Sequence, residues 1–352
     1  MGVQEHALIS EKMYDLFDQI NDEVDNCLRY STRKEQNQEF AKIDFIPDLN
    51  PIRLSEMTAV FELTGNIRQY LRIKETESDP QEKKGRVADK IIIKRVILKM
   101  ENNPEEEAIS TMVDHPHVVK THLTYRCNYI NSKGVDQALL WLFIEALNVK
   151  VSLKENAKKE NEIRDIMKDT LKGLEYLHGS HIAHLDLKLA NVMGYKDENS
   201  NIIYKIIDFG FSRKLPESQQ EETYPKRCYG TFPYKPPEVW ISSIHGFASD
   251  IWCVGAMSLF LANRKSAYFQ KKTPNANAGG NTKDYAEFRQ FLEETVRIKI
   301  DSETSPELVS FIKDCMQRNR KNRPTATELL KHSFILGEKL SSQAAKKLEY
   351  YV

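Results

Sequence analysis

Two short runs of polar residues in this 352-residue chain carry the side chains best suited to chemistry. The first run is His184-Leu-Asp-Leu-Lys-Leu-Ala-Asn191, and the second is Asp208-Phe-Gly210. Together they place two carboxylates, an ammonium and an amide on short loops beside a predicted strand. Phosphoryl transfer uses this set: an acceptor for a hydroxyl proton, a cation on the moving phosphoryl group, and oxygen donors for Mg²⁺. The sequence therefore predicts phosphoryl-transfer chemistry at these loops.

The two runs resemble the motifs H-R-D-L-x-x-x-N and D-F-G of the eukaryotic protein-kinase family, with Leu185 in place of the arginine. The resemblance implies that Asp186 accepts or orients the proton of a substrate hydroxyl. It implies that Lys188 neutralises the γ-phosphoryl group of ATP and that Asn191 and Asp208 bind Mg²⁺. Lys188 also indicates the Ser/Thr branch of the family rather than the tyrosine branch.

The resemblance extends from about residue 57 to residue 334, and its later part indicates a protein substrate. The run Gly230-Thr-Phe-Pro-Tyr-Lys-Pro-Pro-Glu238 is similar to the family's G-T-x-x-Y-x-A-P-E, with proline where alanine is usual. Its Thr231 again favours Ser/Thr acceptors. Asp250, in the run Asp-Ile-Trp-x-x-Gly, matches the residue that steadies the catalytic loop, and Arg323 matches the arginine that pairs with Glu238.

Toward the N-terminus, Lys94 lies in the β-branched run at 91–98 and matches the lysine that holds the α- and β-phosphates. Its partner should be a glutamate on the following helix. Counting back from His115 and Pro116 gives Glu106, which we favour. Glu105 is the alternative, because it would place an isoleucine rather than a serine one turn later.

The adenine site implied by the resemblance involves residues from two further strands. In the strand at 139–145, Ile144 would be the gatekeeper, and Glu145 and Leu147 would offer backbone groups to adenine. Met193 falls where a side chain forms the floor of the adenine pocket. Gly65 is assigned to the phosphate-binding loop.

Three departures from the family concern nucleotide binding and control. The family has G-x-G-x-x-G between its first two strands, but residues 63–70 contain Gly65 alone, with Arg68 as a candidate extra charge. Ile92 replaces a small alanine and adds bulk against the adenine. Leu185 removes the arginine that binds a phosphoryl group on the activation segment in many members, which predicts weak dependence on phosphorylation at Thr223, Tyr224 or Tyr229.

The pattern along the chain predicts an α+β, bilobal protein-kinase fold, with nucleotide in the cleft between a small five-stranded antiparallel sheet plus one helix and a large, mostly helical lobe. Apolar periodicity predicts an amphipathic helix over 8–30, and we favour packing on the domain's own surface over binding of a regulatory partner.

A hairpin is expected from 59–63 and 67–73, turning near Gly65 and Asn66. A helix should open at Pro104, and strands are expected at 118–125 and 139–145. Later helices are expected over 163–177, 248–262, 284–295, 305–317 and 325–333. The predicted domains are 1–55, an N-terminal helical extension; 56–147, the small lobe; 148–335, the large lobe; and 336–352, a short tail.

Composition excludes several classes of protein. Lysine plus arginine equals aspartate plus glutamate at 51 each, so no global charge indicates nucleic acid or an anionic membrane surface. The five cysteines are scattered, which is typical of reduced thiols. No signal pattern is apparent and the longest apolar runs are too short to span a bilayer. We expect a cytoplasmic protein, with the nucleus as the alternative. His115, His117 and His122 suggest a metal cluster on paper, but the family binds no metal there.

These patterns predict an ATP- and Mg²⁺-dependent kinase that phosphorylates Ser/Thr residues of protein substrates. The alternative is a pseudokinase that acts as a binding or scaffold module with weak nucleotide binding. The runs at 182–188 and 205–211 are weakly similar to the calmodulin-dependent kinase group, and we assign no subfamily.

Overall fold

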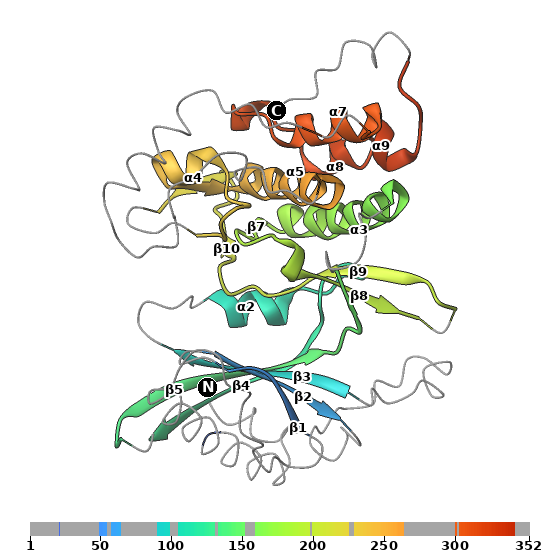
Figure 1. Ribbon diagram of the computed structural model, residues 1–352. Coiled ribbons are helices and arrows are strands. Elements are labelled where there is room, and N and C mark those ends of the chain that lie inside the picture. Colours follow the sequence, from blue (N-terminus) through green and yellow to red (C-terminus); the bar gives the residue numbers. More distant parts are fainter. Residues whose placement is uncertain are drawn as a thin grey trace, which may run out of the picture. The chain divides into compact units, whose positions relative to one another are not determined.

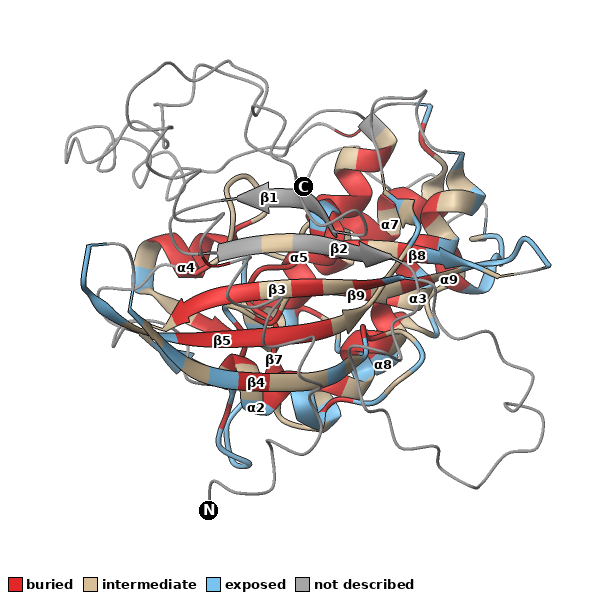
Figure 2. Ribbon diagram, turned by 90° about the horizontal axis from the view of Figure 1, so that it is seen from below, coloured by how far each residue is buried: buried red, intermediate tan, exposed pale blue. Residues whose placement is uncertain are grey.

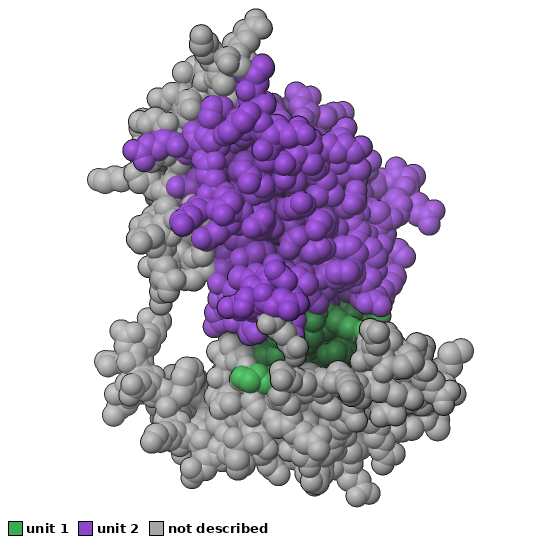
Figure 3. Space-filling view, turned by 90° about the vertical axis from the view of Figure 1, so that its right-hand side faces the viewer, with its two compact units in different colours: residues 1–111, 120–146 green, residues 112–119, 147–352 purple. Residues whose placement is uncertain are grey.

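The computed structural model describes residue 21 and residues 49–54, 58–64, 90–98, 105–130, 133–151, 159–197, 199–224, 229–263, 300 and 303–341. In the strands at 49–54 and 58–64 it describes the backbone and one side chain, Val60. The chain divides into two compact units, each treated by itself below (Figure 3). Unit 1 comprises residues 1–111 and 120–146, and unit 2 comprises residues 112–119 and 147–352.

Unit 1 is built on an antiparallel five-stranded sheet in the order β1-β2-β3-β5-β4 (Figure 1). The strands are β1 (Leu49–Leu54), β2 (Thr58–Thr64), β3 (Lys90–Leu98), β4 (Thr121–Ile130) and β5 (Asp136–Glu145), and helix α2 (Glu105–Met112) follows β3. The centre of the sheet is deeply buried, because β3 and β5 are rich in β-branched and aromatic residues (Figure 2). Ile93, Trp141 and Phe143 are fully buried there. The five-stranded sheet with one helix is therefore as predicted.

The position of the first hairpin was predicted wrongly. β1 pairs with β2, so the first two strands are joined by residues 55–57 and not through Gly65 and Asn66. The sequence analysis missed β1 because Pro51 argues against a strand. β1 is an edge strand, and its register shifts between Pro51 and Arg53, which is where a sheet tolerates proline. The sheet consequently begins before residue 56, and Gly65 follows β2 instead of joining the first two strands. Gly65 and the expected strand at 67–73 lie outside the described residues.

Unit 2 is mostly helical and carries three small sheets. Its helices are α3 (Glu160–Gly179), α4 (Pro237–Ser242), α5 (Phe247–Asn263), α7 (Pro306–Cys315), α8 (Ala326–Leu329) and α9 (Ser333–Leu336), with 3₁₀ turns η4 (Leu189–Asn191) and η5 (Arg320–Asn322). The sheets are β6-β8-β9, β7-β10 and β11-β12. Their strands are β6 (Val149–Lys150), β7 (Ile182–Ala183), β8 (Val192–Lys196), β9 (Ile202–Ile206), β10 (Arg213–Lys214), β11 (Glu221–Thr223) and β12 (Ile244–Gly246).

The helices of unit 2 follow the predicted pattern closely. α3 buries the stripe that predicted it, from Ile163 to Leu177, and α5 and α7 occupy the expected ranges. The helix predicted over 325–333 is two short helices, because the ring of His332 accepts a hydrogen bond from the Phe334 N–H and starts a new helix. The helix predicted over 284–295 lies outside the described residues. Among the helices that are described, none has the length and hydropathy needed to cross a membrane.

Candidate active site

The carboxylate of Asp186 is the centre of a buried polar network in unit 2. Its Oδ2 accepts hydrogen bonds from Lys188 Nζ at 2.7 Å and Asn191 Nδ2 at 3.2 Å. Its Oδ1 accepts one from the Thr231 hydroxyl at 2.6 Å, and that hydroxyl accepts one from Lys188 Nζ at 2.8 Å. Because a carboxylate has about four acceptor sites and an ammonium three donors, one of each is left over. The geometry thus leaves room for an acceptor hydroxyl at Asp186 and an anion at Lys188.

The backbone of this loop is fixed by Asp250 at the start of α5. One carboxylate oxygen accepts from the His184 N–H at 2.8 Å and the other from the Leu185 N–H at 2.9 Å. Leu185 has a φ of 65°, a left-handed conformation that is costly for a leucine and that these two bonds hold. His178 contributes a third contact to Asp250, at 3.0 Å. The predicted role of Asp250 in steadying the loop therefore has a direct geometric basis.

Asn191 and Asp208, the predicted Mg²⁺ ligands, are joined through the backbone. The Ile207 N–H donates to the Asn191 carbonyl oxygen at 3.0 Å, which holds the residue before Asp208 beside Asn191. Both amide hydrogens of Asn191 are used on Asp186, one on its carbonyl oxygen at 2.9 Å and one on its carboxylate. The amide oxygen of Asn191 accepts no hydrogen bond within the described part of the chain. An amide oxygen and a carboxylate are donors of the kind that a hard divalent cation prefers.

In unit 1, the predicted ion pair of Lys94 is present. Its Nζ lies 2.5 Å from Oε1 of Glu106, and the two side chains are 14% and 9% exposed. The structure thus selects Glu106 over Glu105. Ser110, one turn after Glu106, is buried, so a small polar side chain occupies the position where an apolar residue is usual. A role of this pair in holding phosphates stays a prediction.

The residues assigned to adenine are half-buried, and their backbone groups differ in availability. The Glu145 N–H already donates to the Lys120 carbonyl oxygen at 3.0 Å, so any contribution of Glu145 to adenine falls to its carbonyl oxygen. Ile92 and Ile144 are directly opposite each other on β3 and β5. In unit 2, Leu147 has no backbone hydrogen bond among the described residues, and Met193 lies in β8.

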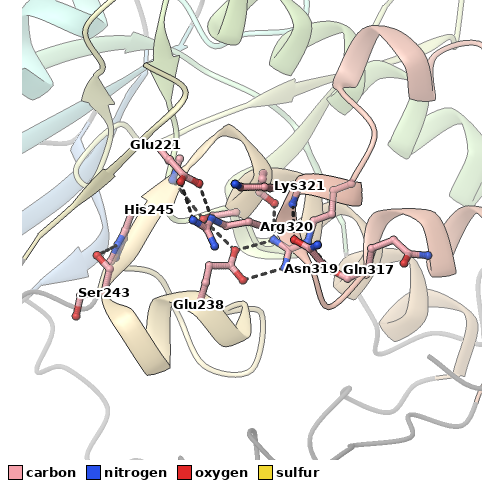
Figure 4. Close-up of polar contacts among 12 residues, drawn as sticks. Glu221, Glu238, Ser243, His245, Gln317, Asn319, Arg320 and Lys321 are labelled. Atoms are coloured by element: carbon pink, nitrogen blue, oxygen red, sulfur yellow. Dashed lines mark hydrogen bonds and ion pairs between the residues drawn. The ribbon is translucent and has the colours of Figure 1, made fainter. Parts of the chain in front are cut away.

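The segment at 230–238 is anchored by the predicted pair of Glu238 and Arg323. Arg323 donates to both carboxylate oxygens, at 2.6 and 2.8 Å, and its side chain is fully buried. It also donates to the carbonyl oxygens of Ala248 and Gln317, each at 2.8 Å. A more exposed pair, Glu221 with Arg320, lies nearby (Figure 4). A bidentate buried pair of this kind fixes the segment in one geometry.

Three buried residues, whose contacts with one another sequence reasoning missed, lie beside the catalytic loop. Arg213 donates to the hydroxyl of Tyr229 at 2.7 Å, and the Tyr229 N–H donates to Nε2 of His245 at 3.0 Å. The other ring nitrogen of His245 bonds the Ser243 carbonyl oxygen (Figure 4). Burial, Lys235 and Arg213 lower the pKa of His245 to about 4, although Asp250 acts in the opposite direction. No spacing in the sequence indicates these contacts, because each joins residues brought together by the fold.

The sequence analysis expected no metal at His115, His117 and His122, and the first two of these histidines have other contacts in the structure. The ring of His115 stacks on Tyr176 with centroids 4.9 Å apart, and His117 bonds the Tyr204 carbonyl oxygen at 3.1 Å. His122 belongs to unit 1, whereas the other two histidines belong to unit 2. The first two histidines therefore serve packing and local hydrogen bonding.

Comparison with known proteins gives the class of this chain. Residues 77–335 match the model of the protein kinase domain, which covers most of the chain. The chain belongs to the protein-kinase family, and the small antiparallel sheet and helical unit described above are consistent with its bilobal fold. The match begins after β2, so it leaves out the region where the family's glycine-rich loop would lie.

Relatives of this chain are protein kinases, two of which are named as serine/threonine kinases. A probable serine/threonine-protein kinase, mkcE, of Dictyostelium discoideum is 31% identical over 67% of this chain and 30% of its own length. Mitogen-activated protein kinase kinase kinase 2 of Arabidopsis thaliana is 29% identical over 70% of this chain and 35% of its own length. Serine/threonine-protein kinase pakC of Dictyostelium discoideum is 30% identical over 69% of this chain and 48% of its own length. The chain spans less than half the length of these relatives. Similarity to the calmodulin-dependent group stays a prediction.

Proposed function

We propose that this protein is an active kinase that transfers the γ-phosphoryl group of ATP to Ser/Thr hydroxyls of protein substrates. The single observation that carries the proposal is the network around Asp186, in which Lys188, Asn191 and Thr231 all contact one carboxylate. A pseudokinase, which does not transfer a phosphoryl group, would not need this network. Each of the four side chains keeps the group that phosphoryl transfer requires.

In the proposed reaction, the substrate hydroxyl takes the remaining acceptor site on Asp186. The carboxylate orients the hydroxyl oxygen toward the phosphoryl group and accepts its proton as the new P–O bond forms. Lys188 places its third N–H on the transferring group and neutralises charge as it moves. Both side chains are held by other contacts, so little reorganisation accompanies the step.

ATP and Mg²⁺ are the cofactors that this arrangement implies. Asn191 and Asp208 would hold the cation, and Lys94, kept extended by Glu106, would bind the α- and β-phosphates. When bound, Mg²⁺ supplies charge neutralisation at the phosphate oxygens. We propose Leu147 and the carbonyl oxygen of Glu145 as partners of the adenine.

The proposal is tested by incubating the full chain with radiolabelled ATP, Mg²⁺ and a generic protein substrate. Analysis of the phosphorylated amino acids should show phosphoserine and phosphothreonine. No label above that of the heat-denatured chain would contradict the proposal, and label on tyrosine alone would contradict the assignment to the Ser/Thr branch.

A second candidate function is a pseudokinase that binds partners without transferring phosphate. The observation in its favour is that residues 55–57, Ser-Glu-Met, which connect β1 to β2 along the chain, contain no glycine. Without glycine the backbone approaches phosphates less closely. A ligand at 100 times its Kd stabilises a protein by about 2.7 kcal/mol, so a thermal shift with millimolar Mg·ATP separates the two candidates. Absence of a shift in the wild type would favour the pseudokinase, and Lys94→Met provides the control for specific binding.

A further inference from the structure

The catalytic loop lacks the arginine to which a phosphorylated activation segment would be tied. We use activation segment for residues 208–238, of which residues 225–228 lie outside the described part. Leu185, at the arginine's position, belongs to an apolar cluster formed by Ala183, Leu185, Leu215 and Tyr229, with Tyr224 and Phe247 packed against it. The side chains that form this cluster are uncharged. The described contacts of the segment show what holds it instead.

Arg213 is a buried cation whose main side-chain partner is a tyrosine of that segment. It is 5% exposed, and its Nη2 donates to the Tyr229 hydroxyl at 2.7 Å. The guanidinium carbon lies 4.7 Å from the centroid of the Tyr229 ring, and Nη1 donates to the Ser212 carbonyl oxygen at 2.8 Å. Within the described residues Arg213 forms no ion pair. Because burial of a charge without compensation is costly, the phenol oxygen and the ring face of Tyr229 take the place of a counter-ion.

The contact joins two parts of the activation segment, and the strand β10, which carries Arg213, pairs with β7 just before the catalytic loop. Arg213 lies opposite Ala183 in the β7-β10 sheet, three residues before Asp186. Tyr229 lies two residues before Thr231, whose hydroxyl contacts Asp186. Between them, Gly230 has a φ of 95°, and a Cβ there would lie 3.1 Å from the Leu185 carbonyl oxygen. Tyr229 therefore sits where a shift of its ring would move Thr231 away from the catalytic carboxylate.

The far side of Tyr229 is held as well. Its N–H donates to Nε2 of His245 at 3.0 Å, and its ring packs edge-on against the rings of Tyr224 and His245, with centroids 5.3 and 5.2 Å away. β11 of the segment pairs with β12, which carries His245.

We propose that Arg213 and Tyr229 are positioning residues that hold the activation segment against the catalytic loop in place of a phosphoryl group and its arginine. The proposal rests on the proposed kinase function. It accounts for Leu185, because a segment that is held by Tyr229 and Arg213 does not require an arginine at position 185 of the catalytic loop. Its consequence is a kinase whose substrate segment is ordered without prior phosphorylation.

The test uses the full chain carrying Tyr229→Phe, which removes the hydroxyl and keeps the ring. Tyr195→Phe, at a 42% exposed tyrosine of β8, is the matched control. We expect kcat/KM for a protein substrate to fall roughly ten- to a hundredfold in Tyr229→Phe, because small misplacement of positioned groups is costly. The KM for Mg·ATP should stay at the wild-type value. Phosphatase treatment of the wild type should change its activity by less than about twofold.

A second measurement does not depend on catalysis. Hydrogen exchange of the amides at 229–234 in the full chain should be faster in Tyr229→Phe than in Tyr195→Phe. Equal exchange and equal kcat/KM in these two variants would overturn the anchor, as would complete loss of wild-type activity after phosphatase treatment. A wild type that transfers no phosphate while Tyr229→Phe accelerates exchange would contradict the proposed function and support the anchor.

Discussion

His245 provides a prediction whose magnitude follows from its surroundings. The side chain is 1% exposed, its Nε2 accepts the Tyr229 N–H, and its pKa is lowered to about 4 by burial and by the nearby Lys235 and Arg213. The neutral ring is therefore the form that the folded chain requires. In the unfolded chain a histidine has a pKa of about 6.5.

The sign and size of the effect follow from proton linkage. Between these two pKa values the unfolded state binds more protons, so the stability contributed by His245 is present above about pH 6.5 and is lost as the pH falls toward 4. From pH 7 to pH 5 the loss amounts to about 2 kcal/mol in the free energy of unfolding. His245→Gln should be free of this loss, because glutamine offers an acceptor to the Tyr229 N–H and does not titrate.

The assay is urea unfolding of the wild type and His245→Gln at pH 7 and pH 5. The difference in unfolding free energy between the two proteins should shift by about 2 kcal/mol in favour of the variant at the lower pH. His122→Gln, at an exposed histidine of β4, controls for the loss of one titratable side chain. A difference that is the same at both pH values for His245→Gln would refute the reasoning, because it would show that folding does not perturb His245.

Two further predictions concern ionic and hydrogen-bonded pairs, and both are read by urea unfolding at neutral pH. Arg323→Met should lower the free energy of unfolding by about 3–5 kcal/mol, because it leaves Glu238 buried without its partner. Arg320→Met, at a partly exposed pair, should lower it by less than about 1 kcal/mol. Equal losses in the two variants would contradict the burial argument. Asn21→Ala should cost about 1.5–3 kcal/mol, because Asn21 accepts a 2.7 Å hydrogen bond from the buried Arg95; a cost near zero would show that this contact does not form in solution.

The sequence predicted the residues whose partners lie at spacings fixed by a regular element or by a motif. Glu106 was found by counting back from Pro116, since the short helix α2 fixes the distance to the turn that follows. The pair of Glu238 and Arg323 was expected from motif positions alone. The buried face of α3 followed from its 3.6-residue periodicity.

Other features depended on tertiary context. The strand containing Pro51 was missed because its position at the sheet edge cannot be read from local propensity. The first hairpin was then predicted at Gly65-Asn66, where the sequence has a typical turn signal. Arg213 and Tyr229 contact each other across 16 residues of sequence, which no local pattern of the sequence shows. Contacts across long sequence separations were therefore the main information that the structure added.

The proposed kinase activity is tested most directly by the rate of phosphoryl transfer in Asp186→Asn against that in Asp197→Asn. The carboxylate of Asp186 receives three side-chain hydrogen bonds in the network described above, whereas the carboxylate of Asp197 accepts hydrogen bonds from Asn201 between β8 and β9, well away from that network. We expect Asp186→Asn to lose about a hundredfold or more of the wild-type rate while still binding Mg·ATP, and Asp197→Asn to retain that rate. Equal rates in the two variants would contradict the assignment of Asp186 as the catalytic carboxylate.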